Sequence, residues 1–404
     1  MKVLPQEDGQ NFWNIFQKKN IEVHVITTKW YNQGKLSWTN DIKNKGVIIH
    51  ALSNPLYNLQ NTFPWAFNFL DKSAQILRYN VFSYFDEAHF WTIIHKQKIK
   101  KIIRNNDIKY VIATGPPYSV NCFAANLKTE IKGIKVIQDI RDPWTDDLYF
   151  KINTKKFKTQ KKAEITMLNN SDAVVAVTNS LLEIYKKKCT NAAVKFKTIY
   201  NGYDPDDASI NSEKEHKIIL EEKHINICYF GSIGAGRENQ LLKFANVLSK
   251  QGKETYSKFR ITTFGSIDNN MDKIIRKLPA GDIFNFYSFI SGDQIQYYMK
   301  VSTIHMSINS EIYPYAFGTK VYDAFLYKKK VLLISPEGEL YNLIKNNALG
   351  YVTDGSDDQT KLIISQIISD HNNAERKESS SSFNYNQFSI PNLSEEYLDF
   401  LNKI

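Results

Sequence analysis

Short apolar runs alternate with helix-like stretches along most of the chain, and this alternation limits the possible folds more than any other feature. The runs lie at 22–27, 47–50, 110–114, 134–137 and 173–177 in the first half, and at 225–230, 259–264, 304–308 and 331–334 in the second. Most are nearly continuous Val and Ile, which is typical of parallel strands buried on both faces. Strands separated by helices need crossover connections. We therefore predict an α/β protein with parallel sheets.

The chain of 404 residues is long enough for two domains. The polar stretch Asp204–His224 lies between the two series of runs and is interpreted as a linker. We predict a Rossmann-like domain over 1–204, a second over 205–382, and a helical tail over 383–404 whose helix has Ser394 as its N-cap.

Composition limits the functional classes. The three cysteines are scattered, which excludes a disulfide framework and fits a reducing compartment. No apolar run approaches the ~18 residues of a membrane span, and the N-terminus does not resemble a signal peptide, so we predict a soluble cytoplasmic protein. The net charge of +10 favours an anionic partner, although a lysine-rich solvated surface explains it equally well. The histidines form no metal pattern, and no nucleic-acid-binding motif occurs.

A glycine-rich turn follows the run at 225–230 and precedes the helix predicted at 239–249. Its sequence is Gly231-Ser232-Ile233-Gly234-Ala235-Gly236-Arg237. Glycines let a backbone approach a ligand closely, and a helix N-terminus favours anions. Arg237 adds a bidentate phosphate donor. A tight turn with a surface arginine is the alternative.

A second candidate is the segment Gly318–Phe325, just before the run at 331–334. Gly318 is expected to open a helix, with Thr319 and Lys320 beside it. A lysine at a helix start opposes the helix dipole unless an anion such as a diphosphate binds there. Asp323, one turn on, is placed to accept hydrogen bonds from ribose hydroxyls. The alternative is a surface i,i+3 ion pair with Lys320.

Two further turns follow strands of the first half. The first places Asp139, Arg141 and Asp142 together at a strand end, which is costly to bury unless a ligand or mutual pairing satisfies the charges. The second runs from Gly115 and Pro116 to Ser119, which is expected to cap the next helix.

Taken in order, these turns resemble the GT-B-fold glycosyltransferases of family 4, especially the bacterial surface-polysaccharide (O-antigen and capsule) members. The similarity runs from about Val81 to Gly350. The segments that carry it are Phe85-Asp86-Glu87, Gly115-Pro116-Pro117, Asp139–Trp144, Ile199–Asp204, Tyr229–Arg237, Phe264-Gly265, Lys320–Phe325 and Pro336–Gly350.

The resemblance implies two Rossmann-like domains that face each other across a cleft, with the C-terminal helix packed back on the N-terminal domain. It implies retaining transfer from a UDP- or GDP-sugar to a glycan or lipid-diphosphate-linked acceptor, without cofactor or essential metal. The implied donor-diphosphate site is Gly231, Arg237, Gly318, Thr319 and Lys320, with Asp323 on the ribose. Asp139, Arg141 and Asp142 would be catalytic, and Gly115, Pro116 and Asn201 would line the cleft.

Three positions depart from the family pattern. Tyr315 and Asp323 stand where glutamates are usual, and no lysine follows Arg237. Two other functions therefore stay open. One is a sugar-nucleotide epimerase of the same fold, and the other is a degenerate sugar-nucleotide-binding protein. The basic charge and the aromatic run Phe63–Leu70 suit a lipid-linked acceptor at the inner face of the plasma membrane, although that run is equally interpretable as core.

Overall fold

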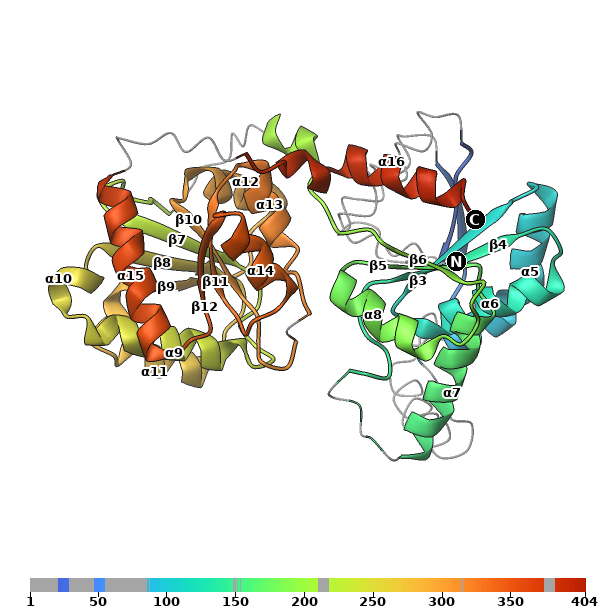
Figure 1. Cartoon of the computed structure of the whole chain (residues 1–404), viewed down its shortest axis with the longest axis horizontal. Helices are drawn as coiled ribbons and strands as arrows, with labels where there is room; N and C mark the ends of the chain where they lie inside the picture. The colour runs from blue at the N-terminus through green and yellow to red at the C-terminus, as the bar shows by residue number, and fades with distance from the viewer. Residues whose placement is uncertain are drawn as a thin grey trace. The chain divides into compact units, whose positions relative to one another are not determined.

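The computed structural model describes residues 21–28, 47–54, 86, 88–147, 150, 152, 154–209, 218–313, 315–373 and 382–404. The aromatic run Phe63–Leu70 lies outside these residues. The chain forms two compact units, Met1–Tyr200 with Leu393–Ile404, and Asn201–Asn392 (Figure 1). The domain limits given above remain a proposal. No described helix has the length and apolar character of a membrane span.

The first unit contains parallel strands only. β1 (His24–Thr28) pairs with β2 (Ile48–Leu52), and a four-stranded sheet has the order β3 (Tyr110–Gly115), β4 (Lys135–Ile140), β5 (Ala173–Ala176) and β6 (Lys195–Thr198). Its helices are α5 (His89–Asn105), α6 (Tyr118–Glu130), α7 (Lys155–Asn169), α8 (Asn179–Lys188) and α16 (Ile390–Leu401).

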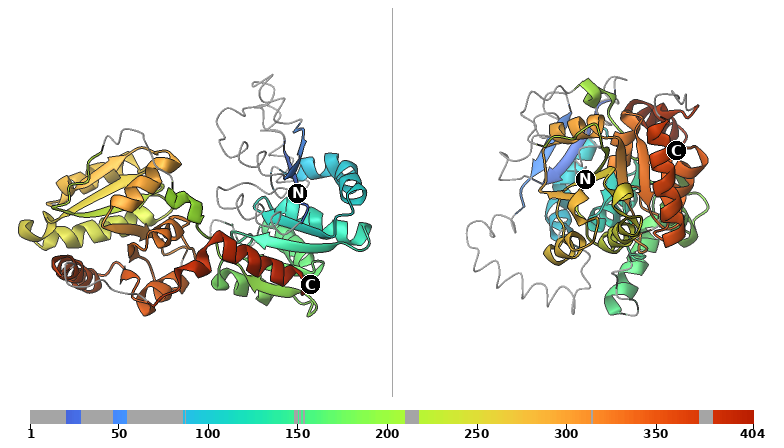
Figure 2. Two further views of the ribbon diagram at one scale, coloured as in Figure 1. Left: turned by 90° about the horizontal axis from the view of Figure 1, so that it is seen from above. Right: turned by 90° about the vertical axis from the view of Figure 1, so that its left-hand side faces the viewer.

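Alternating residues of β4 and β5 face two different helix layers. Ile140 and Val174 pack against α6, α7 and α8. Ile137 and Val175 lie on the other face and contact Leu393, Tyr397, Phe400 and Leu401 of α16. The C-terminal helix (red) therefore covers one face of the first unit's sheet (Figure 2), which confirms the expected return of the chain.

The second unit has one six-stranded parallel sheet. Its order is β12 (Gly350–Thr353), β11 (Lys330–Ile334), β10 (Ile304–Ile308), β7 (Ile225–Phe230), β8 (Phe259–Phe264) and β9 (Phe284–Tyr287). The α-helices are α9 (Arg237–Lys250), α10 (Lys253–Tyr256), α11 (Asn269–Arg276), α12 (Gly292–Val301), α13 (Lys320–Leu326), α14 (Glu339–Asn346) and α15 (Asp357–Asn372). The 3₁₀ helices are η2 (Pro205–Ser209), η3 (Gly281–Ile283) and η5 (Tyr385–Phe388).

The core of the second unit also follows the strand period. Ile225 and Ile227 of β7 pack with α9, α11 and α15 on one face. On the other face Phe230 stacks on Phe264, which in turn stacks on Tyr298 of α12. Both faces of the sheet are thus covered, which explains the continuous apolar runs.

Every predicted run is a strand, but β6, β9 and β12 were not predicted. β6 contains two lysines, β9 follows the 3₁₀ helix η3, and β12 begins with a glycine, so none has a buried Val/Ile run. Part of the predicted linker forms η2.

Three predicted helix starts are wrong. Ser119 does not cap α6, because Pro117 is the N-cap and Asp86 accepts hydrogen bonds from both the backbone N–H and the hydroxyl of Ser119. Gly318 does not open α13, which begins at Lys320 with Thr319 before it. Ser394 lies fully buried inside α16, four residues after its start.

Candidate active site

The strand order of the second unit reverses beside β7. The chain runs from β7 to β8 and β9 in one direction, then returns to β10, β11 and β12 on the other side. This is the order of a doubly wound dinucleotide-binding sheet. Ligands bind such sheets at the carboxyl ends of the two strands that flank the reversal. Here those strands are β7 and β10, and the loops that follow them are Gly231–Gly236 and Asn309–Thr319.

The loop after β7 needs glycine at specific points. Gly236 is the N-cap of α9 with φ 87°, a left-handed conformation that side chains rarely adopt. Gly265, which follows β8, passes so close to this loop that a Cβ on it would lie 1.9 Å from the Gly231 carbonyl oxygen. The backbone of the glycine loop is therefore held directly against the next strand end. Arg237, the first residue of α9, directly follows this fixed loop.

The loops after β7 and β10 touch. A Cβ on Gly236 would lie 3.0 Å from the Ser310 Cβ. Asn309 holds the β10 loop in shape, because its side chain donates to the Ala316 carbonyl oxygen over 2.8 Å. Ser310 is buried, and its hydroxyl has no hydrogen-bond partner within the described part of the chain. Sequence reasoning did not single out Ser310, because nothing local marks its position.

Lys320 lies at the end of the β10 loop, half-buried, with its Nζ 3.0 Å from the Asp323 Oδ2. This is the i,i+3 ion pair given above as the alternative. Asp323 is buried, however, so the pair is not an ordinary surface contact. Burial first, and then the nearby charge of Lys320, lower the pKa of His305 to about 3, so the ring stays neutral. The sequence pattern places His305 in a strand and gives no sign of this contact.

The acid nearest the Tyr315 position does not supply the missing glutamate. Glu311 is exposed, and its Oε1 pairs with Lys243 Nζ at 2.9 Å on α9. In the second unit, Gly231, Gly318 and Thr319 thus lie on the two touching loops at the switch point. Arg237, Lys320 and Asp323 lie in the first turns of the helices that follow these loops.

In the first unit, the carboxylates of the charged turn after β4 lie in different environments. Asp139 is buried, and its Oδ2 accepts hydrogen bonds from Thr114 Oγ1 at 2.9 Å and from Arg141 Nε at 3.3 Å. The internal pairing considered above therefore holds for Asp139. Asp142 is different, because its side chain is exposed.

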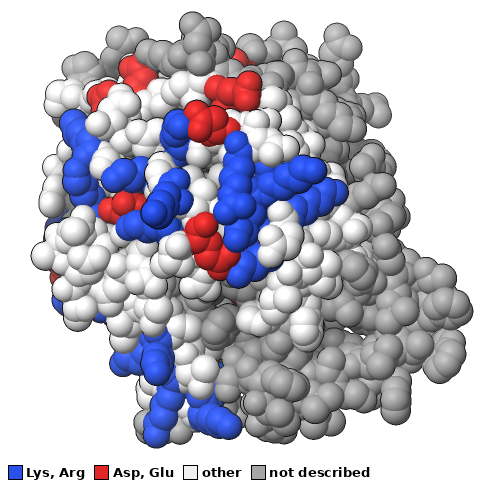
Figure 3. Space-filling view, turned by 90° about the vertical axis from the view of Figure 1, so that its right-hand side faces the viewer, with Lys and Arg blue, Asp and Glu red and all other residues white. Residues whose placement is uncertain are grey.

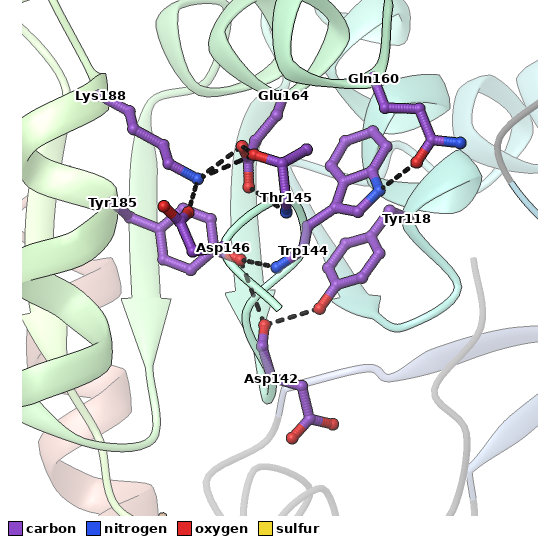
Figure 4. Close-up of polar contacts among 9 residues, drawn as sticks. All are labelled: Tyr118, Asp142, Trp144, Thr145, Asp146, Gln160, Glu164, Tyr185 and Lys188. Carbon is purple, nitrogen blue, oxygen red and sulfur yellow. Dashed lines mark hydrogen bonds and ion pairs between the residues drawn. The ribbon is translucent and has the colours of Figure 1, made fainter. Parts of the chain in front are cut away.

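Side chains from helices α6, α7 and α8 form a network of contacts with the turn that contains Asp142 (Figure 4). The Asp142 carbonyl oxygen accepts hydrogen bonds from the hydroxyls of Tyr118 at 2.6 Å and Tyr185 at 3.2 Å. The Trp144 N–H donates to Tyr185 at 3.0 Å, and the Trp144 ring stacks on Tyr118 at 4.8 Å. The Asp142 carboxyl points away from this network in Figure 4.

Ionic contacts fix the following residues of the turn. Glu164 on α7 is fully buried and accepts from Lys188 Nζ at 2.6 Å. Both groups also bond the Thr145 hydroxyl, and Lys188 pairs with Asp146. Lone buried charges are costly, so this pair holds the turn rigidly only as long as both members are present. We define Tyr118, Tyr185, Glu164 and Lys188 as the turn clamp.

The environment raises the pKa of Asp142. The main cause of the raised pKa is partial loss of water around the carboxyl, because the surrounding chain crowds it although it stays accessible from one side. The positive charge of Arg141 opposes the rise, and the negative charge of Asp147 adds to it. A carboxyl with a raised pKa on a rigid turn is suited to general acid–base work.

Gly115 ends β3 and leads into the Pro116 turn, with both proline peptide bonds cis. A Cβ on Gly115 would meet the Asn121 Oδ1 at 2.2 Å, because Asn121 is held beneath it by hydrogen bonds to the Ala113 carbonyl and to Gln138. Gly115 and Pro116 thus lie at the same sheet edge as Asp142. Asn201 is the first residue of the second unit, whereas Gly115 and Pro116 belong to the first.

Residues 78–207 match the family described as Glycosyltransferase Family 4. The matched segment of the chain is similar to this family. This segment contains the turn clamp and Asp142, and the match identifies the enzyme as a transferase that moves glycosyl groups. No curated protein matches the sequence.

The whole chain shares its fold with solved glycosyltransferases. A glycosyltransferase from Rickettsia africae is 15% identical, with 98% of this chain and 94% of that chain covered at a TM-score of 0.63. Anabaena HepE in complex with UDP and glucose is 12% identical, with 99% and 96% covered at 0.61. Sucrose-phosphate synthase from Thermosynechococcus elongatus is 13% identical, with 97% and 91% covered at 0.63. The two Rossmann-like units are thus those of the GT-B fold.

Proposed function

We propose that the enzyme transfers a sugar, with retention of configuration, from a UDP- or GDP-sugar to a lipid-linked glycan acceptor in surface-polysaccharide synthesis. It would act in the cytoplasm at the inner face of the plasma membrane. The observation that carries the proposal is the pair of cations, Arg237 and Lys320, at the starts of the two helices that follow the loops of the β7/β10 switch point.

The chemistry of the leaving group fits this placement. Departure of a nucleoside diphosphate builds negative charge on phosphate oxygens, which fixed cations and the N-terminus of α9 stabilise. Arg237 and Lys320 would bind the diphosphate, with Gly231, Gly318 and Thr319 lining it, and we expect neither a cofactor nor an essential metal. Asp323 would hold the ribose once Lys320 turns to the donor. HepE has been solved with UDP and with UDP-glucose, which supports a nucleotide-sugar donor here.

The acceptor side would use the turn after β4. Asp142 and Asp146 are the exposed carboxylates of that turn, and Asp146 pairs with Lys188. We therefore assign Asp142 the contact with the acceptor, and assign Asp139 and Arg141 to holding the turn. This narrows the catalytic set to Asp142. Gly115 and Pro116, and separately Asn201, would line the space for the acceptor.

The decisive assay measures transfer and hydrolysis for a panel of UDP- and GDP-sugars with the full chain, and determines product masses. An elongated acceptor supports the proposal, whereas an isomerised donor would identify an epimerase. Nucleotide-sugar binding without any turnover would identify a degenerate binding protein.

Lys320→Ala tests the diphosphate contact. Loss of one such charge contact costs on the order of 10²–10³ in kcat, and circular dichroism should report an unchanged fold. Lys250→Ala is the matched control, because it also removes a lysine from a carboxylate pair, with Asp357, but is the last residue of α9, at the opposite end of that helix from the glycine loop. Equal rates for the Lys320→Ala variant and the parent enzyme would rule out the role of Lys320.

A further inference from the structure

Helix α5 exposes apolar side chains on the face that points away from the core. Trp91, His95, Ile99 and Ile103 form its buried side. Opposite them, Phe90, Ile93 and Ile94 are exposed at 38%, 57% and 54%. Two adjacent isoleucines more than half exposed, with a phenylalanine one turn before, form an apolar patch over the first two turns of the helix.

The same face becomes basic toward the C-terminal end of α5. Lys98, Lys101 and Arg104 are exposed there, and the helix contains no acidic residue. Lys96 and Lys100 lie at the border of this face and pair with Glu130 of α6. Lys98 and Lys101 form no ion pair within the described residues. Figure 3 shows lysine and arginine side chains, with a smaller number of acidic ones among them, on the side of the molecule that carries α5.

Apolar and basic residues therefore share one stripe. From Phe90 to Arg104 the stripe is about 21 Å long, at ~1.5 Å per residue. We define the outer face of α5 as Phe90, Ile93, Ile94, Lys98, Lys101 and Arg104.

We propose that the outer face of α5 docks the enzyme on an anionic lipid bilayer. The isoleucines and the phenylalanine enter the boundary between headgroups and acyl chains, while the lysines and the arginine contact lipid phosphates. Charge complementarity selects an anionic surface, and the exposed isoleucines favour a bilayer over a nucleic acid, whose backbone offers them no apolar partner.

This inference names the surface that would make the membrane contact proposed above. Its biological role rests on the proposed function, but the binding itself does not. Vesicle binding needs no sugar, donor or acceptor. Transfer to a water-soluble acceptor measures the proposed function separately, so either proposal can fail alone.

The test is co-sedimentation of the full chain with phosphatidylglycerol/phosphatidylcholine vesicles and with pure phosphatidylcholine vesicles. We expect binding to the anionic vesicles only, and release at high salt. The double variant Lys98→Gln/Lys101→Gln should bind roughly thirtyfold more weakly, because each lysine near an anionic surface contributes about fivefold. Ile93→Ser/Ile94→Ser should weaken binding about tenfold while leaving the charge unchanged.

A matched control removes similar residues from the second unit. Lys273 and Lys277, with the exposed Ile274 between them, lie on and just after α11. Lys273→Gln/Lys277→Gln and Ile274→Ser should leave binding at the parent level. Equal losses in both sets would show a general charge effect and overturn the proposal. So would binding that persists in the α5 variants, duplex DNA binding without vesicle binding, or self-association that Ile93→Ser/Ile94→Ser abolishes.

Discussion

Asp142 combines a fixed backbone with an accessible carboxyl. Its backbone is held by two tyrosine hydroxyls, whereas its side chain stays accessible to a substrate. Asp139, only three residues earlier, is buried, and its Oδ2 accepts hydrogen bonds from Thr114 and Arg141. The role of each acid in this turn is therefore set by its environment and not by its type.

The raised pKa of Asp142 predicts the pH dependence of transfer. If the carboxylate acts on the acceptor, the rate should fall on the acid side at a pH above the ordinary Asp value of 3.8. Asp147→Asn removes a negative charge and should shift this acid limb to lower pH. Rate–pH profiles of the parent, Asp147→Asn and Asp142→Asn enzymes check this, and an unshifted limb would contradict it.

The same pKa shift has a consequence for stability. Because the folded pKa of Asp142 lies above its unfolded value, the folded chain binds more protons between the two values. This group's contribution to the free energy of unfolding therefore falls as pH rises through that window.

Gly265 is the residue whose replacement should damage the donor loop most directly. An alanine Cβ would lie 1.9 Å from the Gly231 carbonyl oxygen, so the two loop backbones must separate. We expect Gly265→Ala to weaken nucleotide-sugar binding at least about tenfold and to lower the melting temperature by several degrees. Gly292→Ala is the control, since a Cβ at that position would have no described atom within 4 Å, and it should be neutral or slightly stabilising. Calorimetric titration with nucleotide sugar measures the difference.

At the scale of elements, the turn clamp couples helices α6, α7 and α8 to the end of β4. Tyr185→Phe removes a hydroxyl that accepts from the Trp144 N–H and donates to the Asp142 carbonyl. Leaving a buried N–H without an acceptor costs about 1–3 kcal/mol. Chemical denaturation should show this loss. kcat should also fall, with KM for the donor unchanged.

The control for this variant is Tyr341→Phe, whose hydroxyl makes a single 3.5 Å contact with Gln359 in the second unit. It should change the free energy of unfolding by less than about 1 kcal/mol. A clamp variant with parent-like kcat would show that the turn needs no such support.

At the scale of the whole molecule, the end of the chain completes the core of the first unit. Leu393, Tyr397 and Leu401 pack on Ile137 and Val175, more than two hundred residues earlier. Leu393→Ala should cost about 2–5 kcal/mol of unfolding free energy, because it opens a cavity in that core. Asp399→Ala, on the exposed side of the same helix, should cost little. Equal unfolding midpoints for the two variants would contradict this role of α16.

The sequence alone determined the alternation of strands and helices, and with it the loops to which we assign the proposed donor site. Buried parallel strands must be continuous in apolar residues, and a glycine turn followed by a helix is a local pattern, so both can be recognised without knowing the partners. Arg237, Lys320 and Asp323 were singled out as candidates in this way.

Only the tertiary structure decided which residues in those loops are accessible and which are already satisfied. Pro117, not Ser119, became the N-cap of α6, Asp139 turned inward while Asp142 remained exposed, and Ser310 was brought against Gly236. These outcomes depend on partners from other parts of the chain: Asp86 for Ser119, Thr114 of β3 for Asp139, and Gly236 for Ser310. Burial and hydrogen bonding between distant segments leave no periodic trace in the sequence, so the roles of individual side chains emerged only once those segments were packed together.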